Sequence, residues 1–132
     1  MLDLPKLEFE GTVFSGKGEG KKFVSLPWVT SQIEQKLGFT PYSGTLNIRL
    51  NEKTKGNRQL LDPKKGITLQ PQVGYCPGIV FYASISGCKG AIVIPIIPSY
   101  PSDVIEVISP RYLRGKLCLI DGKKVTVWVT VF

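Results

Sequence analysis

The segment GIVFYASISGCKGAIVIPII, residues 78–97, specifies a fold more clearly than any other part of the chain. It contains two apolar runs, Gly78–Ile85 and Ala91–Ile97, and each has the length of a buried strand. Between them, Ser86–Gly90 supplies the glycines of a turn. Two such runs joined by a glycine-containing turn predict a β-hairpin. Pro95 interrupts the second run, which is far too short to cross a membrane as a helix.

Further apolar or alternating runs of strand length lie on both sides of this hairpin. Alternation is clearest at the C-terminus, where valines occupy every second position from Val125 to Val131. A period of two predicts strands with one buried face. The candidate strands outside the hairpin are Leu7–Phe14, Phe23–Leu26, Thr45–Leu50, Ile67–Gln70, Val104–Ile108 and Lys124–Phe132.

One helix of useful length is predicted. Apolar residues recur at helical spacing at Val29, Ile33 and Leu37. Gly38 marks its end, whereas its start is ambiguous. Pro27 suits a first helical turn, and Ser31 with Glu34 resembles a capping box.

The arrangement of these elements favours an all-β architecture. Residues 51–66 are polar and predict an excursion loop, and Ser109-Pro110 predicts a short helical turn that runs through Arg114. About six to seven short strands without a β-α-β rhythm favour a closed, mostly antiparallel β-barrel with Greek-key-like connections. We therefore expect residues 1–132 to form one mostly β domain with a single α-helix.

The composition excludes several classes of protein. With 42% hydrophobic and 20% charged residues, the chain is not disordered, and its N-terminus lacks the basic and apolar regions of a signal peptide. We expect a cytoplasmic protein that does not bind membranes. The absence of histidine excludes Ser-His-Asp triads, Cys-His pairs and His-ligated zinc. Phosphoryl transfer, which depends on positioning and charge neutralisation, suits the remaining carboxylates, lysines and tyrosines.

Cysteine content and net charge narrow the possible ligands. Cys76, Cys88 and Cys118 lack metal-ligand spacing, so we expect free thiols that are buried or half-buried. The net charge of +7 favours anionic partners, either nucleic acid or a small phosphorylated ligand. An ordinary solvated surface would give the same balance.

Two polar segments follow or begin predicted strands. Gly16, Lys17, Gly18, Glu19, Gly20 and Lys21 form a glycine-rich segment. Its backbone N–H groups could form an anion-binding nest, although a flexible hairpin loop would have the same composition. Thr45 and Asn47 stand two residues apart on one strand face, so their oxygens could hold Mg²⁺. The alternative is the polar outer face of an ordinary strand.

A third segment combines a carboxylate with two arginines. Glu106 lies mid-strand among valines and isoleucines, where it could serve as a general base or simply face solvent. Arg111 and Arg114 are three residues apart, which places them on one face of the predicted helical turn. They could face an anion at the helix N-terminus or form an ordinary surface pair.

Five ordered motifs together resemble the archaeal CTP-dependent riboflavin kinases. Each motif alone is weak, but their order and spacing match the family over nearly the whole chain. The motifs are SGKGEG (15–20), SLP (25–27), LGFTPYSGTLN (37–47), GAIVIP (90–95) and EVISPRYLR (106–114).

The resemblance implies a cradle-loop β-barrel enzyme that transfers the γ-phosphoryl group of CTP to the 5′-hydroxyl of riboflavin, giving FMN and CDP. It implies that Thr45 and Asn47 bind Mg²⁺ or another divalent cation, and that Glu106 contacts the flavin. Pro98 stands where the family usually has a flavin-contacting threonine. Either Ser99 makes this contact after a one-residue shift, or the contact is lost. The implied nucleotide contacts are Gly16, Lys17, Gly18, Glu19, Gly20, Lys21, Arg111, Tyr112, Leu113 and Arg114.

Two other classes remain as alternatives. A small basic β-barrel could bind single-stranded nucleic acid, but the aromatic residues do not cluster with lysine and arginine on one strand pair. A swapped-hairpin dimer like those of some transcription factors is suggested only by the turn at Leu119–Gly122. We expect a monomer that does not bind nucleic acid. Some relatives carry an additional N-terminal DNA-binding domain, for which this chain has no room.

Overall fold

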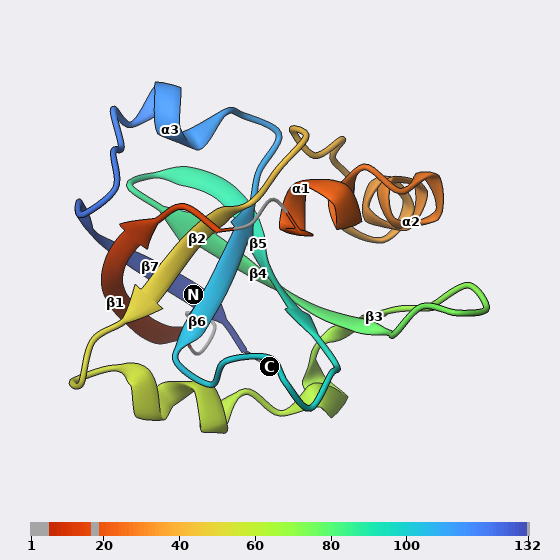
Figure 1. Ribbon diagram of the computed structural model, residues 1–132, viewed down its shortest axis with the longest axis horizontal. Helices are drawn as coiled ribbons and strands as arrows, with labels where there is room; N and C mark the ends of the chain where they lie inside the picture. Colours follow the sequence, from red (N-terminus) through yellow and green to blue (C-terminus); the bar gives the residue numbers. More distant parts are fainter. Residues whose placement is uncertain (1–5, 17–18, 132) are drawn as a thin grey trace, which may run out of the picture.

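Six antiparallel strands close into a barrel in the computed structural model, which describes residues 6–16 and 19–131 (Figure 1). Their order around the ring is β4-β5-β6-β2-β1-β7, and β7 pairs again with β4. The predicted mostly β barrel is therefore confirmed. The strands of the ring are β1 (Lys6–Phe14), β2 (Leu46–Leu50), β4 (Gly78–Ile85), β5 (Cys88–Pro95), β6 (Val104–Ile108) and β7 (Lys124–Thr130).

A seventh strand, β3 (Ile67–Leu69), lies outside the ring. It pairs with the beginning of β4, at Gly78–Val80, and the end of β4, at Ala83–Ile85, pairs with β7. Strand β4 thus pairs with β3 at its beginning and with β7 at its end. The loop between β3 and β4 projects from the barrel, at the right of Figure 1.

The β4–β5 hairpin is confirmed, with a tighter turn than the sequence predicts. Cys88, Lys89 and Gly90 pair with β4 instead of forming part of the turn. The turn has only two central residues, Ser86 and Gly87, with φ angles of 47° and 79°. Positive φ at both positions is the geometry of a type I′ turn, which suits the twist of paired strands.

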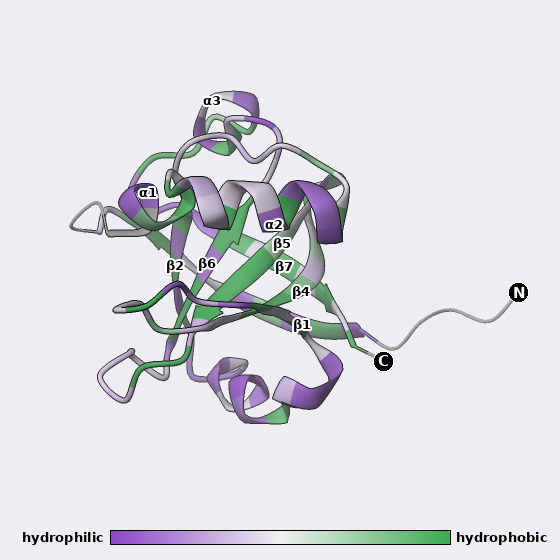
Figure 2. Cartoon of the chain, turned by 90° about the vertical axis from the view of Figure 1, so that its right-hand side faces the viewer, coloured by the Kyte–Doolittle hydropathy of each residue, from purple (hydrophilic) through white to green (hydrophobic). Residues whose placement is uncertain are grey.

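Burial on both faces explains the continuous apolar sequence of this hairpin. Residues that point into the barrel, including Phe81 and Ile92, join the main core. Val80 and Val93 point outward into a second cluster, where Ile33 of helix α2 (Pro27–Leu37) packs against them. In Figure 2, α2 lies across the apolar strands of this side of the barrel. Strands that are covered on both faces lose the polar alternation seen in β7.

Helix α2 is confirmed, but its start differs from the capping-box interpretation. It begins at Pro27, so Ser31 lies in its middle and accepts a hydrogen bond from Gln35 Nε2 at 3.4 Å. The end is as predicted, because Gly38 adopts a φ of 83° and its N–H donates to the Glu34 carbonyl. A proline in the first turn has no N–H to satisfy, and it is therefore the better start.

The predicted strand at Phe23–Leu26 is wrong. Phe23 and Val24 end a short helix, α1 (Glu19–Val24), and the chain then turns into α2. Val24 is buried in the cluster beneath α2. A four-residue apolar run has no period that separates helix from strand, and here tertiary packing selects the helix.

The helical turn near Arg114 begins later than predicted. Helix α3 (Leu113–Lys116) starts after Tyr112, so Arg111 precedes it. Ser109 does not cap this helix. Its hydroxyl donates to the Lys89 carbonyl at 3.0 Å and accepts from the Arg111 N–H at 3.2 Å, which forms a local turn instead.

The predicted excursion between β2 and β3 contains two 3-10 helices, η1 (Lys55–Leu60) and η2 (Pro63–Lys65). Buried Thr54 fastens this excursion to the barrel, because its hydroxyl donates to the Glu10 carbonyl at 2.9 Å. The excursion therefore has a defined position beneath the barrel rather than the freedom of a loop.

The three cysteines are free, as predicted. Their burial differs from the expectation, since Cys76 and Cys118 are exposed and only Cys88 is half-buried. Of the helices in the described residues, none has the length and apolar character needed to cross a membrane.

Candidate active site

Strand pairing brings three predicted site residues together. Asn47 of β2 lies directly opposite Glu106 of β6, and on its other side it lies opposite Phe14 of β1. Paired residues of antiparallel strands share a face, so both polar side chains point out of the barrel. Thr45 precedes β2 and lies on the same side. Leu46 and Ile48 point into the core, which is the alternation that the sequence predicts.

The Glu106 carboxylate accepts hydrogen bonds at both of its oxygens. Thr45 Oγ1 donates to Oε1 at 2.9 Å, and the hydroxyl of Tyr100 donates to Oε2 at 2.6 Å. With its amide NH₂ turned towards Glu106, Asn47 donates to Oε1 at 3.3 Å. A carboxylate held by several donors has a fixed orientation, and this one is only partly buried.

Gly16 lies close against Asn47 at the edge of this cluster. Its N–H donates to the Asn47 side-chain oxygen at 3.2 Å in the same amide orientation. A Cβ atom at this position would lie 2.7 Å from the end of the Asn47 side-chain amide, so that amide would have to move. The predicted glycine-rich segment therefore begins beside Asn47. Lys17 and Gly18 lie outside the described residues, and Glu19, Gly20 and Lys21 belong to α1.

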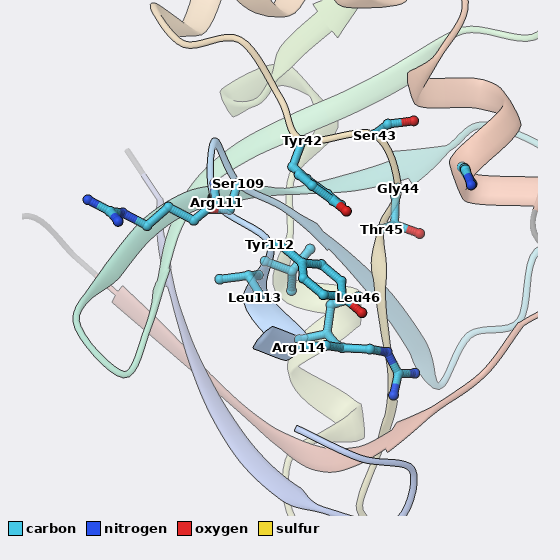
Figure 3. Close-up of a pocket in the computed structure, with 12 residues that line it drawn as sticks. Tyr42, Ser43, Gly44, Thr45, Leu46, Ser109, Arg111, Tyr112, Leu113 and Arg114 are labelled. Atoms are coloured by element: carbon cyan, nitrogen blue, oxygen red, sulfur yellow. Dashed lines mark hydrogen bonds between the residues drawn. The ribbon is translucent and has the colours of Figure 1, made fainter. Parts of the chain in front are cut away.

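A polar cavity of about 280 Å³ opens on one side of Thr45 (Figure 3). The described residues that line it include three cations and no carboxylate. Tyr42 and Tyr112 stack beside it, with ring centroids 4.9 Å apart and planes inclined by 27°. Its lining residues are Lys21, Tyr42, Ser43, Gly44, Thr45, Leu46, Val107, Ser109, Arg111, Tyr112, Leu113 and Arg114.

The two arginines of this cavity do not share a face. Arg111 is exposed, and its guanidinium extends away from Arg114 in Figure 3. Arg114 Nη2 donates to the Phe14 carbonyl at 3.2 Å and to Asp121 Oδ1 at 2.9 Å. The hydroxyl of Ser15 and then the Arg114 guanidinium hold the pKa of Asp121 below its usual value. The prediction of a shared face is wrong because Arg111 precedes α3.

A second, apolar cavity of about 230 Å³ also borders Thr45. Glu106 is the only carboxylate among the described residues that line it. Pro98 and Ser99 are exposed in the loop between β5 and β6 and do not line this cavity, whereas Ile97 and Tyr100 of the same loop do. Its lining residues are Phe23, Thr45, Tyr75, Cys76, Val93, Pro95, Ile97, Tyr100 and Glu106.

Sequence reasoning missed the aromatic residues of the apolar cavity and the contacts of Tyr100. Phe23 and Tyr75 lie 52 positions apart in the sequence and each packs against Trp28, with ring centroids 5.9 and 5.6 Å away. The Arg58 guanidinium lies 5.7 Å from the centroid of the Tyr100 ring. Neither set of residues has a local spacing in the sequence that would have indicated it, because each set is assembled from segments that lie far apart in the chain.

No group of three His, Cys, Asp or Glu side chains that could hold a metal ion occurs within residues 6–16 and 19–131. A metal at this site would instead need the neutral oxygens of Thr45 and Asn47 beside the single carboxylate of Glu106.

Comparison with known proteins finds one matching family model and several similar riboflavin kinases. The family model CTP-dep_RFKase, described as domain of unknown function DUF120, matches residues 13–129. The chain is 42% identical to a riboflavin kinase of Saccharolobus solfataricus, covering 99% of this chain and 78% of that protein. It is 41% identical to one of Sulfurisphaera tokodaii, covering 93% of this chain and 95% of that protein.

Other relatives are considerably longer than this chain. A riboflavin kinase of Archaeoglobus fulgidus is 42% identical over 127 residues, which are 93% of this chain but only 54% of that protein. The chain thus spans about half the length of this relative.

Proposed function

This chain belongs to the CTP-dependent riboflavin kinase family, and from that premise we propose that it transfers the γ-phosphoryl group of CTP to the 5′-hydroxyl of riboflavin, giving FMN and CDP. The observation that carries the proposal is the pair of cavities that meet at Thr45. One is polar and cationic, and the other is apolar and aromatic. A kinase for a flavin needs both environments, with the phosphate and the acceptor hydroxyl at their junction.

The polar cavity suits a nucleoside triphosphate. Lys21 and Arg114 supply positive charge for phosphate oxygens, and the guanidinium of Arg114 is already oriented by the Phe14 carbonyl and Asp121. The stacked rings of Tyr42 and Tyr112 offer a flat surface for a base. Polar groups that satisfy the edge of cytosine would be left unpaired by adenine, which is the physical basis for a preference for CTP.

The apolar cavity suits the flat ring system of riboflavin. Phe23, Tyr75 and Val93 provide apolar and aromatic surface, and Glu106 lies at the end nearest Thr45. A ring bound among these side chains would direct its ribityl chain towards the junction of the cavities. The expected contact of Ser99 with the flavin would require movement of its loop, because Ser99 lies outside the cavity lining.

The oxygen atoms at the junction fit a hard divalent cation such as Mg²⁺. In the orientation that satisfies its hydrogen bonds, the Asn47 amide turns its NH₂ towards Glu106. A cation bound here would favour the opposite orientation, because that orientation would bring the oxygens of Thr45, Asn47 and Glu106 together. Thr45 and Asn47 would hold the ion, which would neutralise charge on the phosphate oxygens.

Glu106 is the residue that acts on the acceptor hydroxyl. Its Oε1 would accept a hydrogen bond from the 5′-hydroxyl and orient it for in-line attack on the γ-phosphorus. As the new O–P bond forms, the bond to the bridging oxygen of CDP breaks, and the hydroxyl proton passes to the carboxylate. Neither step requires histidine, in agreement with the composition.

The test is incubation with riboflavin and each of the four nucleoside triphosphates in turn, followed by separation of FMN from riboflavin. We expect the catalytic efficiency with CTP to exceed that with ATP by about two orders of magnitude. Equal use of ATP would contradict the nucleotide assignment alone. No FMN with any nucleotide, together with salt-sensitive binding of single strands, would favour the nucleic-acid-binding alternative.

We further propose that the barrel acts as a monomer in the cytoplasm and does not bind nucleic acid. Light scattering after size exclusion tests the first point, and titration with labelled single-stranded DNA and RNA tests the last.

A further inference from the structure

Tyr100 occupies an unusual position at the Glu106 carboxylate. It lies in the loop between β5 and β6, where its N–H donates to the Ile97 carbonyl at 3.2 Å, and its ring lines the apolar cavity. Its hydroxyl donates to Glu106 Oε2 at 2.6 Å, while Thr45 donates to the other oxygen, Oε1. The two donors hold opposite sides of the carboxylate, so they restrict its rotation.

The surroundings of Tyr100 keep its hydroxyl protonated, so that it acts as a hydrogen-bond donor. Burial and then the Glu106 carboxylate raise the pKa of the Tyr100 hydroxyl well above its usual value, so the O–H bond persists at working pH. The Arg58 guanidinium lies over the Tyr100 ring, and Arg58 Nε donates to the Val104 carbonyl at 3.1 Å. The excursion that carries η1 therefore contacts the ring of Tyr100 and supports it.

We propose that Tyr100 is a positioning residue for phosphoryl transfer, because its hydroxyl holds Glu106 Oε2 and thereby keeps Oε1 turned towards Thr45 and the junction of the two cavities. The inference rests on the proposed function and adds a residue to it. The acceptor hydroxyl must approach at that junction, and a carboxylate free to rotate would present Oε1 there only part of the time. Tyr100 acts through Glu106 and does not itself touch the reacting atoms.

The first test is Tyr100→Phe, which removes one oxygen and retains the ring. A hydrogen bond to a charged group contributes about 1.5–3 kcal/mol, so we expect kcat to fall by about 10- to 100-fold. The KM for CTP and the midpoint of thermal unfolding should stay near the wild-type values. Tyr82→Phe is the matched control, because Tyr82 donates one bond to the Lys36 carbonyl on the outer face of the barrel. It should leave kcat within about twofold.

A double-mutant cycle separates positioning from a general structural effect. If Tyr100 acts through Glu106, then Tyr100→Phe should lower kcat by less than about threefold when Glu106 is already Gln. The same cycle with Tyr82→Phe should be additive. Equal losses from Tyr100→Phe in both backgrounds would show that Tyr100 acts independently of Glu106 and would overturn the proposal.

The outcomes also separate this inference from the proposed function. A wild-type protein that makes no FMN with any nucleotide would overturn the proposed reaction and, with it, the role of Tyr100. If the wild type is active and the Tyr100→Phe variant has the same kcat, the role of Tyr100 alone is overturned. A fall in kcat that accompanies a large loss of thermal stability would also count against it, because the hydroxyl would then be structural.

Discussion

The polar cavity and the apolar cavity share Thr45, but they are assembled differently. Nearly all of the polar cavity comes from two short segments, residues 42–46 and 107–114. The apolar cavity combines side chains of α1, the β3–β4 loop, β5, the β5–β6 loop and β6. A cavity made of contiguous segments can be inferred from sequence motifs. The apolar cavity draws on four separated segments, at positions 23, 45, 75–76 and 93–106, so its assembly depends on how the barrel closes.

The largest effect should come from Glu106, the carboxylate that lines the apolar cavity and accepts a hydrogen bond from Thr45 at the junction. Glu106→Gln retains the shape of the side chain and removes its charge, so it should lower kcat by about 10²- to 10⁴-fold if Glu106 accepts the proton. If the carboxylate only holds the flavin, the KM for riboflavin should rise instead. Steady-state kinetics over a riboflavin series distinguishes the two roles, and no change in either parameter would reject both.

Loss of a neutral oxygen at the junction should have the next largest effect. Thr45→Ala and Asn47→Ala should each lower kcat by about 100-fold, equivalent to a few kcal/mol in the transition state, and leave the fold intact. The measurement is turnover across a Mg²⁺ titration, with circular dichroism as a check on folding. Thr126→Ala on the outer face of β7 is the control and should be nearly silent. Wild-type turnover in both junction variants would contradict the proposed cation site.

The difference between the cavities can be tested with a crossed pair of variants. Arg114→Gln should raise the KM for CTP by about tenfold, because it removes one charge-assisted contact, and should leave the KM for riboflavin unchanged. Tyr75→Leu should raise the KM for riboflavin and leave the KM for CTP unchanged. Arg111→Gln is the matched control, since Arg111 extends away from Arg114, and its effect on the KM for CTP should be smaller. If both variants raised both KM values equally, the separation into two subsites would be wrong.

The smallest effect should come from the cysteines. Replacing Cys76, Cys88 and Cys118 together by serine should leave turnover within a few-fold of wild type, because the thiols are free and two of them are exposed. Elemental analysis should find no stoichiometric zinc. A folded triple variant without activity, or bound zinc in the wild type, would contradict this expectation.

Local sequence features were sufficient for several parts of the fold. The alternation of Val125, Val127 and Val129 predicted the buried face of β7, and Gly38 predicted the end of α2. The type I′ turn at Ser86-Gly87 has the glycine such a turn favours, although the sequence predicted a longer turn. In each case the signal lies within a few residues, because strand period, capping and turn geometry are short-range properties.

The site was predictable in part for the same reason. Thr45 and Asn47 share a strand face by their spacing, and the motifs that contain them and Glu106 indicate the family. The misassigned strand at Phe23–Leu26 and the displaced start of α3 lie where short runs allow more than one structure. Burial against α2 selects the helix at Phe23–Val24, and the turn at Ser109 places the start of α3 after Tyr112.

The sequence by itself determined the barrel, its one long helix and the identity of the polar residues at the junction, because all of these follow from local periodicity and ordered motifs. Only the tertiary structure decided that Asn47 faces Glu106, that Tyr100 holds the second carboxylate oxygen, and that Arg58 supports Tyr100. These contacts depend on strand register and on loops that meet when the ring closes between β4 and β7. Register is fixed by packing across the whole barrel, which no local stretch of sequence can specify.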